Sequence, residues 1–140
     1  NTDAATGGAF GLFYAGAAKG GGARTSALVP GLAQDETVRS NLAVVSLGGG
    51  SELPMTLEAR LYDADTGAAA GTPLTVSLRP GDWYQWSRVL AAAGAPATVK
   101  RFKAVVTRLS GDDTFLAYGV LNDAVTSDGS FQTMIPSDTY

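Results

Sequence analysis

The 140-residue sequence contains no histidine and no cysteine. Without these residues a chain cannot build a Ser-His-Asp or Cys-His triad, a thiolate nucleophile, or a zinc site with the usual nitrogen and sulfur ligands. This double absence excludes most familiar enzyme classes. We therefore expect a protein that is not an enzyme, with no cofactor and no bound metal.

Charge and long apolar runs are also scarce. Charged residues make up 16% of the chain, against about 25% in a typical domain. The net charge of −3 argues against a nucleic-acid partner, because proteins that bind nucleic acid usually carry a basic surface. The longest mildly apolar stretch, residues 9–18, is shorter than the roughly 18 apolar residues of a membrane-spanning helix. We expect neither nucleic-acid binding nor a membrane span.

The sequence starts at Asn1 rather than at a methionine. This start indicates either that a leader was removed or that the chain was excised from a longer protein. The low charge content, with Ser, Thr, Gly, Asn and Gln carrying the polar surface, suits an exported β protein. We expect an extracellular or cell-surface location.

From residue 25 onward, short stretches of alternating apolar and polar residues are separated by Gly, Pro and Asp turns. The expected strands cover residues 27–29, 38–47, 55–63, 72–78, 83–86, 99–109, 114–121 and 131–136. The turn dipeptide Pro30-Gly31 is expected to end the first strand, and residues 88–94 are expected to form one short helical turn. The sequence predicts an all-β fold, an antiparallel Ig-like β-sandwich of about seven or eight strands.

The first 24 residues differ from the rest. Residues 9–15 can form one strand, with Phe10, Leu12 and Tyr14 on one face and Phe13 on the other, followed by a Gly-rich linker. We therefore divide the chain into an N-terminal arm and linker (residues 1–24) and a sandwich domain (residues 25–140). A strand on a flexible linker can add to the sheet edge of a neighbouring subunit. Pairing with its own sandwich remains equally open.

Aromatic residues give the best hint of a ligand. Tyr62, Tyr84 and Trp86 are candidates for an exposed platform of the kind that stacks on sugar rings. Tyr84 and Trp86 share one strand face, while Trp83 points to the other. Because a sandwich strand has one buried face, packing of some of these rings in the core is the other interpretation.

Acidic and basic residues suggest structural roles. The acids that fall in expected turns, where Asp bonds to its own backbone, are Asp63, Asp65, Asp82, Asp112, Asp113, Asp123 and Asp128. Glu58 lies mid-strand without a partner at catalytic spacing. Residues 63–67 resemble the start of an EF-hand calcium-binding loop, but Leu74 occupies the position at which that loop requires a bidentate Glu. The basic run of Lys100, Arg101, Lys103 and Arg108 is typical of a solvated edge strand.

The order of several motifs resembles a group of modules in exported bacterial proteins. These motifs are Val29-Pro30-Gly31, Arg39-Ser40-Asn41-Leu42, Leu61-Tyr62-Asp63-Ala64-Asp65-Thr66-Gly67, Pro80-Gly81-Asp82-Trp83 and Tyr118-Gly119-Val120-Leu121-Asn122-Asp123. The chain departs from the pattern at Ser46, where an Asn often ends the second strand.

The resemblance implies an Ig-like sandwich outside the cytoplasm, found in larger surface proteins and as globular subunits associated with pilins. It brings no catalytic residues. Within the second motif, Arg39 and Asn41 share a face and are expected to bond to neighbouring loops as scaffold residues. We expect a non-enzymatic extracellular assembly module, a subunit of a surface filament or pilus-like appendage joined by N-terminal strand addition. Its partners would be other protein subunits, either copies of itself or a pilin-like chain. The alternative is a carbohydrate-binding module using the surface aromatics.

Overall fold

The computed structural model describes residues 22–51, 53–123, 125 and 129–137. The expected N-terminal strand, with Phe10, Leu12, Phe13 and Tyr14, lies outside the described residues, as does most of the linker. Within the described part, no helix is long and apolar enough to cross a membrane.

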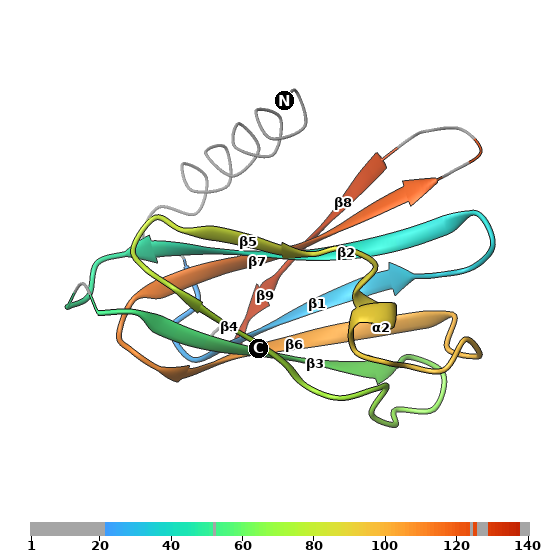
Figure 1. Ribbon diagram of the computed structural model, residues 1–140, viewed down its shortest axis with the longest axis horizontal. Coiled ribbons are helices and arrows are strands. Elements are labelled where there is room, and N and C mark those ends of the chain that lie inside the picture. The colour runs from blue at the N-terminus through green and yellow to red at the C-terminus, as the bar shows by residue number, and fades with distance from the viewer. Residues whose placement is uncertain (1–21, 52, 124, 126–128, 138–140) are drawn as a thin grey trace.

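Two antiparallel sheets stack on each other around a common core (Figure 1). One sheet has five strands in the order β4-β3-β6-β1-β9, and the other has four in the order β5-β2-β7-β8. In chain order the elements are β1 (Ser26–Ala33), β2 (Val38–Gly48), β3 (Met55–Asp63), β4 (Leu74–Leu78), β5 (Trp83–Trp86), α2 (Val89–Ala92), β6 (Arg101–Ser110), β7 (Thr114–Asp123), β8 (Gly129–Thr133) and β9 (Ile135–Pro136). The expected all-β sandwich and short helical turn are confirmed.

The core forms because alternate side chains of each strand point toward the opposite sheet. In β3, Met55, Leu57 and Ala59 are completely buried and Leu61 is 2% exposed, as the alternation predicts. They meet buried residues from both sheets, including Leu42, Val44, Phe102, Val106 and Phe115. Burial of apolar surface of this kind is the main stabilising contribution to such a fold.

The first strand is longer than expected. β1 continues through Pro30-Gly31 to Ala33, and its register with β6 shifts between Val29 and Leu32. This bulge takes Pro30, which has no N–H to donate, out of the ladder, and it places Gly31 at a φ of 77°. The prediction that the strand ends at Pro30-Gly31 is wrong because the dipeptide forms a bulge rather than a turn.

The basic strand lies in the middle of its sheet. β6 pairs with β1 on one side and with β3 on the other, so Arg101 and Lys103 are not on an edge strand. They lie on the outward side of the five-stranded sheet, where Lys103 pairs with Tyr62. The prediction of a solvated strand edge is wrong, since the basic side chains occupy the solvent side of a central strand instead.

The chain passes from one sheet to the other at both sides of the sandwich. On one side β4 and β5 are joined by the Pro80-Gly81 turn, in which the Arg79 amide donates to Asp82 Oδ2 at 2.9 Å. On the other side β8 of the four-stranded sheet is followed directly by β9 of the five-stranded sheet. The outermost strands β4, β5, β8 and β9 have only two to five residues, and short edge strands limit edge-to-edge pairing with other chains.

Candidate functional site

The three aromatic residues of the expected platform lie on different sheets. Tyr62 is on β3 of the five-stranded sheet, whereas Tyr84 and Trp86 are on β5 of the four-stranded sheet. Trp86 is 7% exposed and belongs to the core, while Tyr84 is 42% exposed at the sheet edge. Their rings meet edge to face with centroids 5.3 Å apart. The structure brings Tyr84 and Trp86 together and leaves Tyr62 apart from them.

Trp83 points to the opposite side of β5, away from the core. It lies beside Val45, and its indole N–H donates to the hydroxyl of Tyr118 at 2.9 Å. Tyr118 in turn lies beside Phe131, with ring centroids 6.2 Å apart. An aromatic row therefore crosses the outward side of the four-stranded sheet, from β5 over β7 to β8.

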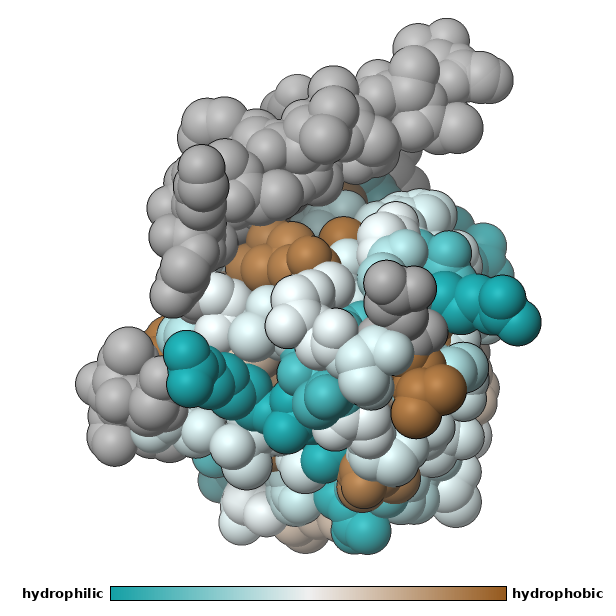
Figure 2. All heavy atoms as spheres, turned by 90° about the vertical axis from the view of Figure 1, so that its left-hand side faces the viewer, coloured by the Kyte–Doolittle hydropathy of each residue, from teal (hydrophilic) through white to brown (hydrophobic). Residues whose placement is uncertain are grey.

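The register of the four strands shows that this row is part of a larger apolar surface, which we call the apolar outer face. Alternation from the inward-facing Leu42, Val44 and Phe115 places its members on the outward side: Ala43, Val45, Trp83, Leu116, Tyr118, Val120 and Phe131. None of these seven residues carries a charge, while the polar Asn41 and the charged Arg39 continue the same side of β2 toward its start. Figure 2, which views the end of the sandwich on the left of Figure 1, shows hydrophobic side chains gathered in its upper part, on the side of this sheet.

The outward side of the five-stranded sheet has a different character. Its residues on β3, β4 and β6 are mostly polar or charged: Thr56, Glu58, Arg60, Tyr62, Thr75, Ser77, Arg101, Lys103 and Thr107. A polar outer side is usual for an antiparallel sheet that faces water. The apolar outer face is therefore a specific property of the four-stranded sheet and the best candidate for a functional surface.

Alternation of apolar and polar residues does not reveal this surface, because both sides of its central strands are apolar. The available signal was the uninterrupted run from Phe115 to Tyr118, in which all four residues are at most 2% exposed. A run without alternation is typical of a strand that is covered on both sides. The described residues thus show that β7 packs against the core with one side and contributes to the apolar outer face with the other.

The described chain begins at this surface. Ala23 pairs with Phe115 through two backbone hydrogen bonds of 2.8 and 3.0 Å, and its side chain is buried in the core. Gly22 lies so close to the end of β2 that a Cβ on it would come within 2.6 Å of Leu47 Cδ1 and 3.2 Å of Thr114. Thr114 is on the same side of β7 as Leu116 and Tyr118. The described part of the chain therefore begins at one end of the apolar outer face.

The carboxylates are used in turns and loop contacts. Asp63 accepts from the amide of Asp65, Asp82 from Arg79, and Asp123 from Val125. The buried Asp113 accepts from the Ser46 hydroxyl and the Gly50 amide, both at 3.0 Å. Glu58 forms an ion pair with Arg60 at 2.8 Å. Among the described residues no cluster of three or more acids is arranged to hold a metal ion.

Asn41 contacts the connection between β5 and α2. Its side-chain oxygen accepts from the backbone N–H of Arg88 at 2.8 Å, at the start of α2. Arg88 has a φ of 49°, a left-handed conformation that is unfavourable for a residue with a side chain. Arg39, on the same side of β2, is exposed and lies opposite Asn122 on β7. Asn41 therefore helps to hold the β5–α2 connection.

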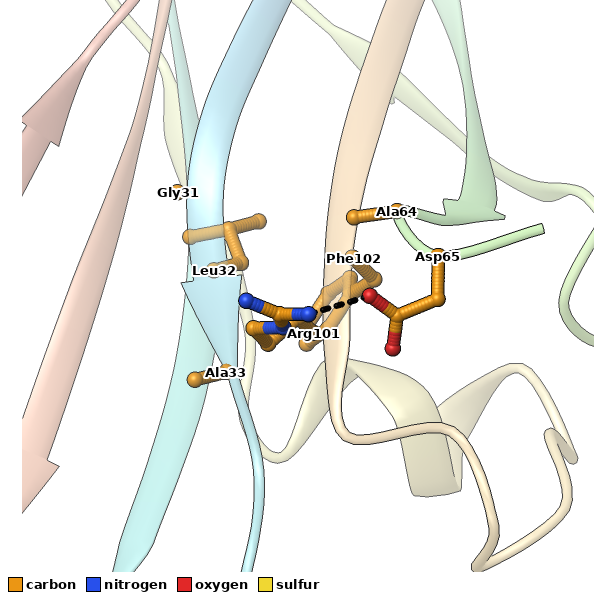
Figure 3. A pocket seen from close by; sticks show the side chains of 7 residues that line it. All are labelled: Gly31, Leu32, Ala33, Ala64, Asp65, Arg101 and Phe102. Atoms are coloured by element: carbon orange, nitrogen blue, oxygen red, sulfur yellow. Dashed lines mark hydrogen bonds and ion pairs between the residues drawn. The ribbon is translucent and has the colours of Figure 1, made fainter. Parts of the chain in front are cut away.

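A recess of about 310 Å³ lies at the other end of the sandwich, between β1, β6 and the loop after β3 (Figure 3). Arg101 and Asp65 meet across its mouth as an ion pair. Both side chains are mostly exposed, at 71% and 51%. Because each charge already has the other as its partner, the recess presents no uncompensated group to select a ligand.

No protein-family model and no curated protein matches this chain. Among solved structures, the crystal structure of Thermotoga maritima 1070 superposes with a TM-score of 0.58 at 12% identity, over 81% of this chain and 92% of that one. The Anabaena sensory rhodopsin transducer gives 0.46 at 12% identity, over 68% and 93%. FlgD from Xanthomonas campestris, a hook-capping protein of flagellar assembly, gives 0.30 at 18% identity, over 83% and 73%.

These comparisons concern the fold. The similarity to the Thermotoga protein supports the two-sheet arrangement. The other two TM-scores are too low to indicate a shared fold. By its fold the chain belongs to the class of all-β, antiparallel sandwich proteins.

Proposed function

We propose that this chain is a non-enzymatic structural or assembly module that acts outside the cell, as a subunit of a surface filament or pilus-like appendage. The observation that carries the proposal is the apolar outer face of the four-stranded sheet. Its rim residues Trp83 and Phe131 are 46% and 42% exposed. Aromatic side chains without neighbouring charge are typical of the centre of protein–protein interfaces.

The chemistry of the rest of the molecule agrees with a binding role. The sequence offers no histidine or cysteine, and Glu58 and the described turn aspartates are engaged in ion pairing or loop hydrogen bonds. The partner is another protein subunit, either a second copy or a pilin-like chain. The N-terminal strand, residues 9–15, is the proposed connecting element, with Phe10, Leu12 and Tyr14 as its anchors.

The test is the assembly state of the purified chain at micromolar concentration, by size exclusion with light scattering and by negative-stain microscopy. We expect oligomers or filaments that are lost when Phe131, on the apolar outer face, is changed to Ser. The matched control is Leu109→Ser, which removes a 54% exposed apolar side chain from β6 of the other sheet. A monomer at all concentrations, or equal loss of assembly in the control, contradicts the proposal.

A carbohydrate-binding function is the second candidate, favoured by the exposure of Trp83 and Tyr84 on the edge strand β5. The two rings point to opposite sides of the strand, so each would have to bind a sugar without the other. Retention on a glycan affinity gel that is lost with Trp83→Ala or Tyr84→Ala, in a folded monomer, would favour this function over assembly.

A further inference from the structure

The apolar outer face needs a cover, because an antiparallel sheet that faces water normally has polar side chains on that side. The centre of the face is buried although its side chains point away from the other sheet: Ala43 is 0% exposed, and Leu116 and Tyr118 are each 2% exposed. Trp83 and Phe131, on the two sides of Tyr118, are much more exposed. The middle of the face is therefore shielded from water, whereas Trp83 and Phe131 at its sides are partly exposed.

The chain itself supplies a segment at the right place. Gly22, the first described residue, lies against Leu47 and Thr114 at the end of the apolar outer face, and 21 residues precede it in the sequence. Residues 9–15 have the sequence Ala-Phe-Gly-Leu-Phe-Tyr-Ala, which contains three aromatic residues and no charge. An uncharged aromatic segment and an uncharged aromatic surface are chemically complementary.

The linker is long enough for this segment to reach every strand of the face. Six residues lie between positions 15 and 22, and the seven steps from one position to the other span at most about 25 Å in an extended chain. The distance from β5 to β8 is three strand spacings, or about 14 Å. The same short tether gives the segment an effective concentration of about a millimolar near its own sandwich. In a chain that has not assembled, the chain's own segment is therefore favoured over that of a second copy free in solution at micromolar concentration.

We propose that residues 9–15 dock on the apolar outer face of their own chain. The inference uses the surface on which the proposed function rests, but it concerns the isolated chain and holds whether or not the chain assembles. In an assembly, the same contact can be made between neighbouring copies by exchange of the segment. The N-terminal segment is then both the cover of the interface in the monomer and the connector between subunits.

The absence of cysteine allows a direct test in the full-length chain. Leu12→Cys is combined with Thr133→Cys, which lies beside Tyr118 on the outward side of β8. The matched control combines Leu12→Cys with Lys103→Cys, on the outward side of the five-stranded sheet. After mild oxidation of the monomer fraction isolated by size exclusion, we expect disulfide-linked monomers with Thr133→Cys, formed at least about tenfold faster than with Lys103→Cys.

Two outcomes overturn the inference. Equal rates for the two cysteine pairs show that the segment does not prefer the apolar outer face. Disulfide-linked dimers in place of linked monomers show that the occupant is a second copy. Linked monomers together with the absence of any oligomer in light scattering would support this inference while contradicting the proposed assembly function, so the two failures are distinguishable.

A second measurement needs no disulfide. In a Trp86→Phe background, Trp83 is the sole tryptophan, and its quenching by acrylamide reports how well the face is covered. We expect Leu12→Ser to raise the quenching constant about twofold or more, and Ala4→Ser, outside the docking segment, to leave it unchanged. An unchanged quenching constant with both substitutions contradicts docking beside Trp83.

Discussion

The indole N–H of Trp83 on β5 reaches across β2 and donates to the hydroxyl of Tyr118 on β7, with 2.9 Å between the two heavy atoms. This bond joins the edge strand of the four-stranded sheet to a central strand on the outward side. It holds the indole against the apolar outer face, where Trp83 remains 46% exposed. The pair therefore connects the packing of the sheet to the surface that we assign to assembly.

Replacing Tyr118 with Phe tests this bond. The change removes the acceptor of the Trp83 N–H and keeps the ring, so we expect a loss of about 0.5–1.5 kcal/mol in the free energy of unfolding. Urea denaturation followed by circular dichroism measures it. Tyr62→Phe, which removes a hydroxyl from the other sheet, is the control, and an equal effect of both changes would contradict a specific role of the bond.

The same substitution has a pH-dependent consequence. Burial raises the pKa of the Tyr118 phenol, although the hydrogen bond from Trp83 opposes the shift. The neutral phenol therefore contributes stability that is fully present below the unfolded pKa of about 10 and is lost as the pH rises through the higher folded value. The range from about pH 9 to about pH 11 covers one unit on either side of the usual phenol pKa. Between these two pH values we expect the free energy of unfolding to fall less in the Tyr118→Phe variant than in the parent chain. Parallel stability profiles would contradict the prediction.

Trp86 and Tyr84 are expected to differ strongly on truncation. Trp86 is 7% exposed and packed in the core, so Trp86→Ala should cost about 3–5 kcal/mol, whereas Tyr84→Ala at the 42% exposed edge should cost less than half as much. Denaturant midpoints measure both changes. Equal losses would place Trp86 outside the core and revive its role in a ligand platform.

Gly119 provides a test of close packing between the sheets. A Cβ at this position would collide with Leu32 Cδ2, a buried atom of β1. Gly119→Ala should therefore destabilise the chain by about 1–3 kcal/mol. The matched control is Gly129→Ala on β8, where a Cβ would meet its nearest neighbour at an ordinary 3.4 Å. The prediction fails if thermal unfolding shows the two variants to be equally stable.

The contact between Asn41 and Arg88 makes a prediction about strain. Asn41→Ala should cost about 1 kcal/mol, because the Arg88 N–H loses its acceptor while Arg88 keeps a φ of 49°. Adding Arg88→Gly should recover part of the loss, since glycine adopts this conformation without strain. A double variant less stable than Asn41→Ala alone would show that the Arg88 side chain, and not its backbone, matters.

Stability in acid should depend on Asp112. Hydrogen bonds from the amide and hydroxyl of Ser51 lower the pKa of the Asp112 carboxyl below its ordinary value. Because the pKa of the Asp112 carboxyl is lower in the folded chain than in the unfolded chain, the ionised carboxylate stabilises the fold above about pH 4. This contribution is lost as the pH falls through the pKa of the folded state. Asp112→Asn keeps an acceptor but not the charge, so it should be less stable than the parent at neutral pH and converge with it in acid. Denaturant midpoints at several pH values measure the difference, and a constant gap would contradict this account.

The sequence by itself determined the class of fold. Period-two alternation in residues 55–61 identified which side chains enter the core, because a strand points successive residues to opposite sides. Glycine, proline and aspartate positions marked most strand ends for similarly local reasons, as at Asp63 and Asp82. The absence of histidine and cysteine excluded whole classes of chemistry without reference to any structure.

Only the tertiary structure decided the strand order and, with it, the surface. The basic strand β6 is central rather than at an edge, and Trp83 meets Tyr118 although 35 positions separate them in sequence. Local patterns cannot contain this information, because pairing between distant strands is set by the packing of the whole chain. The bulge at Pro30-Gly31 and the apolar outer side of the four-stranded sheet follow from the same non-local pairing. The sequence defined what each strand could bury, and the tertiary structure determined which apolar side chains were left to face outward.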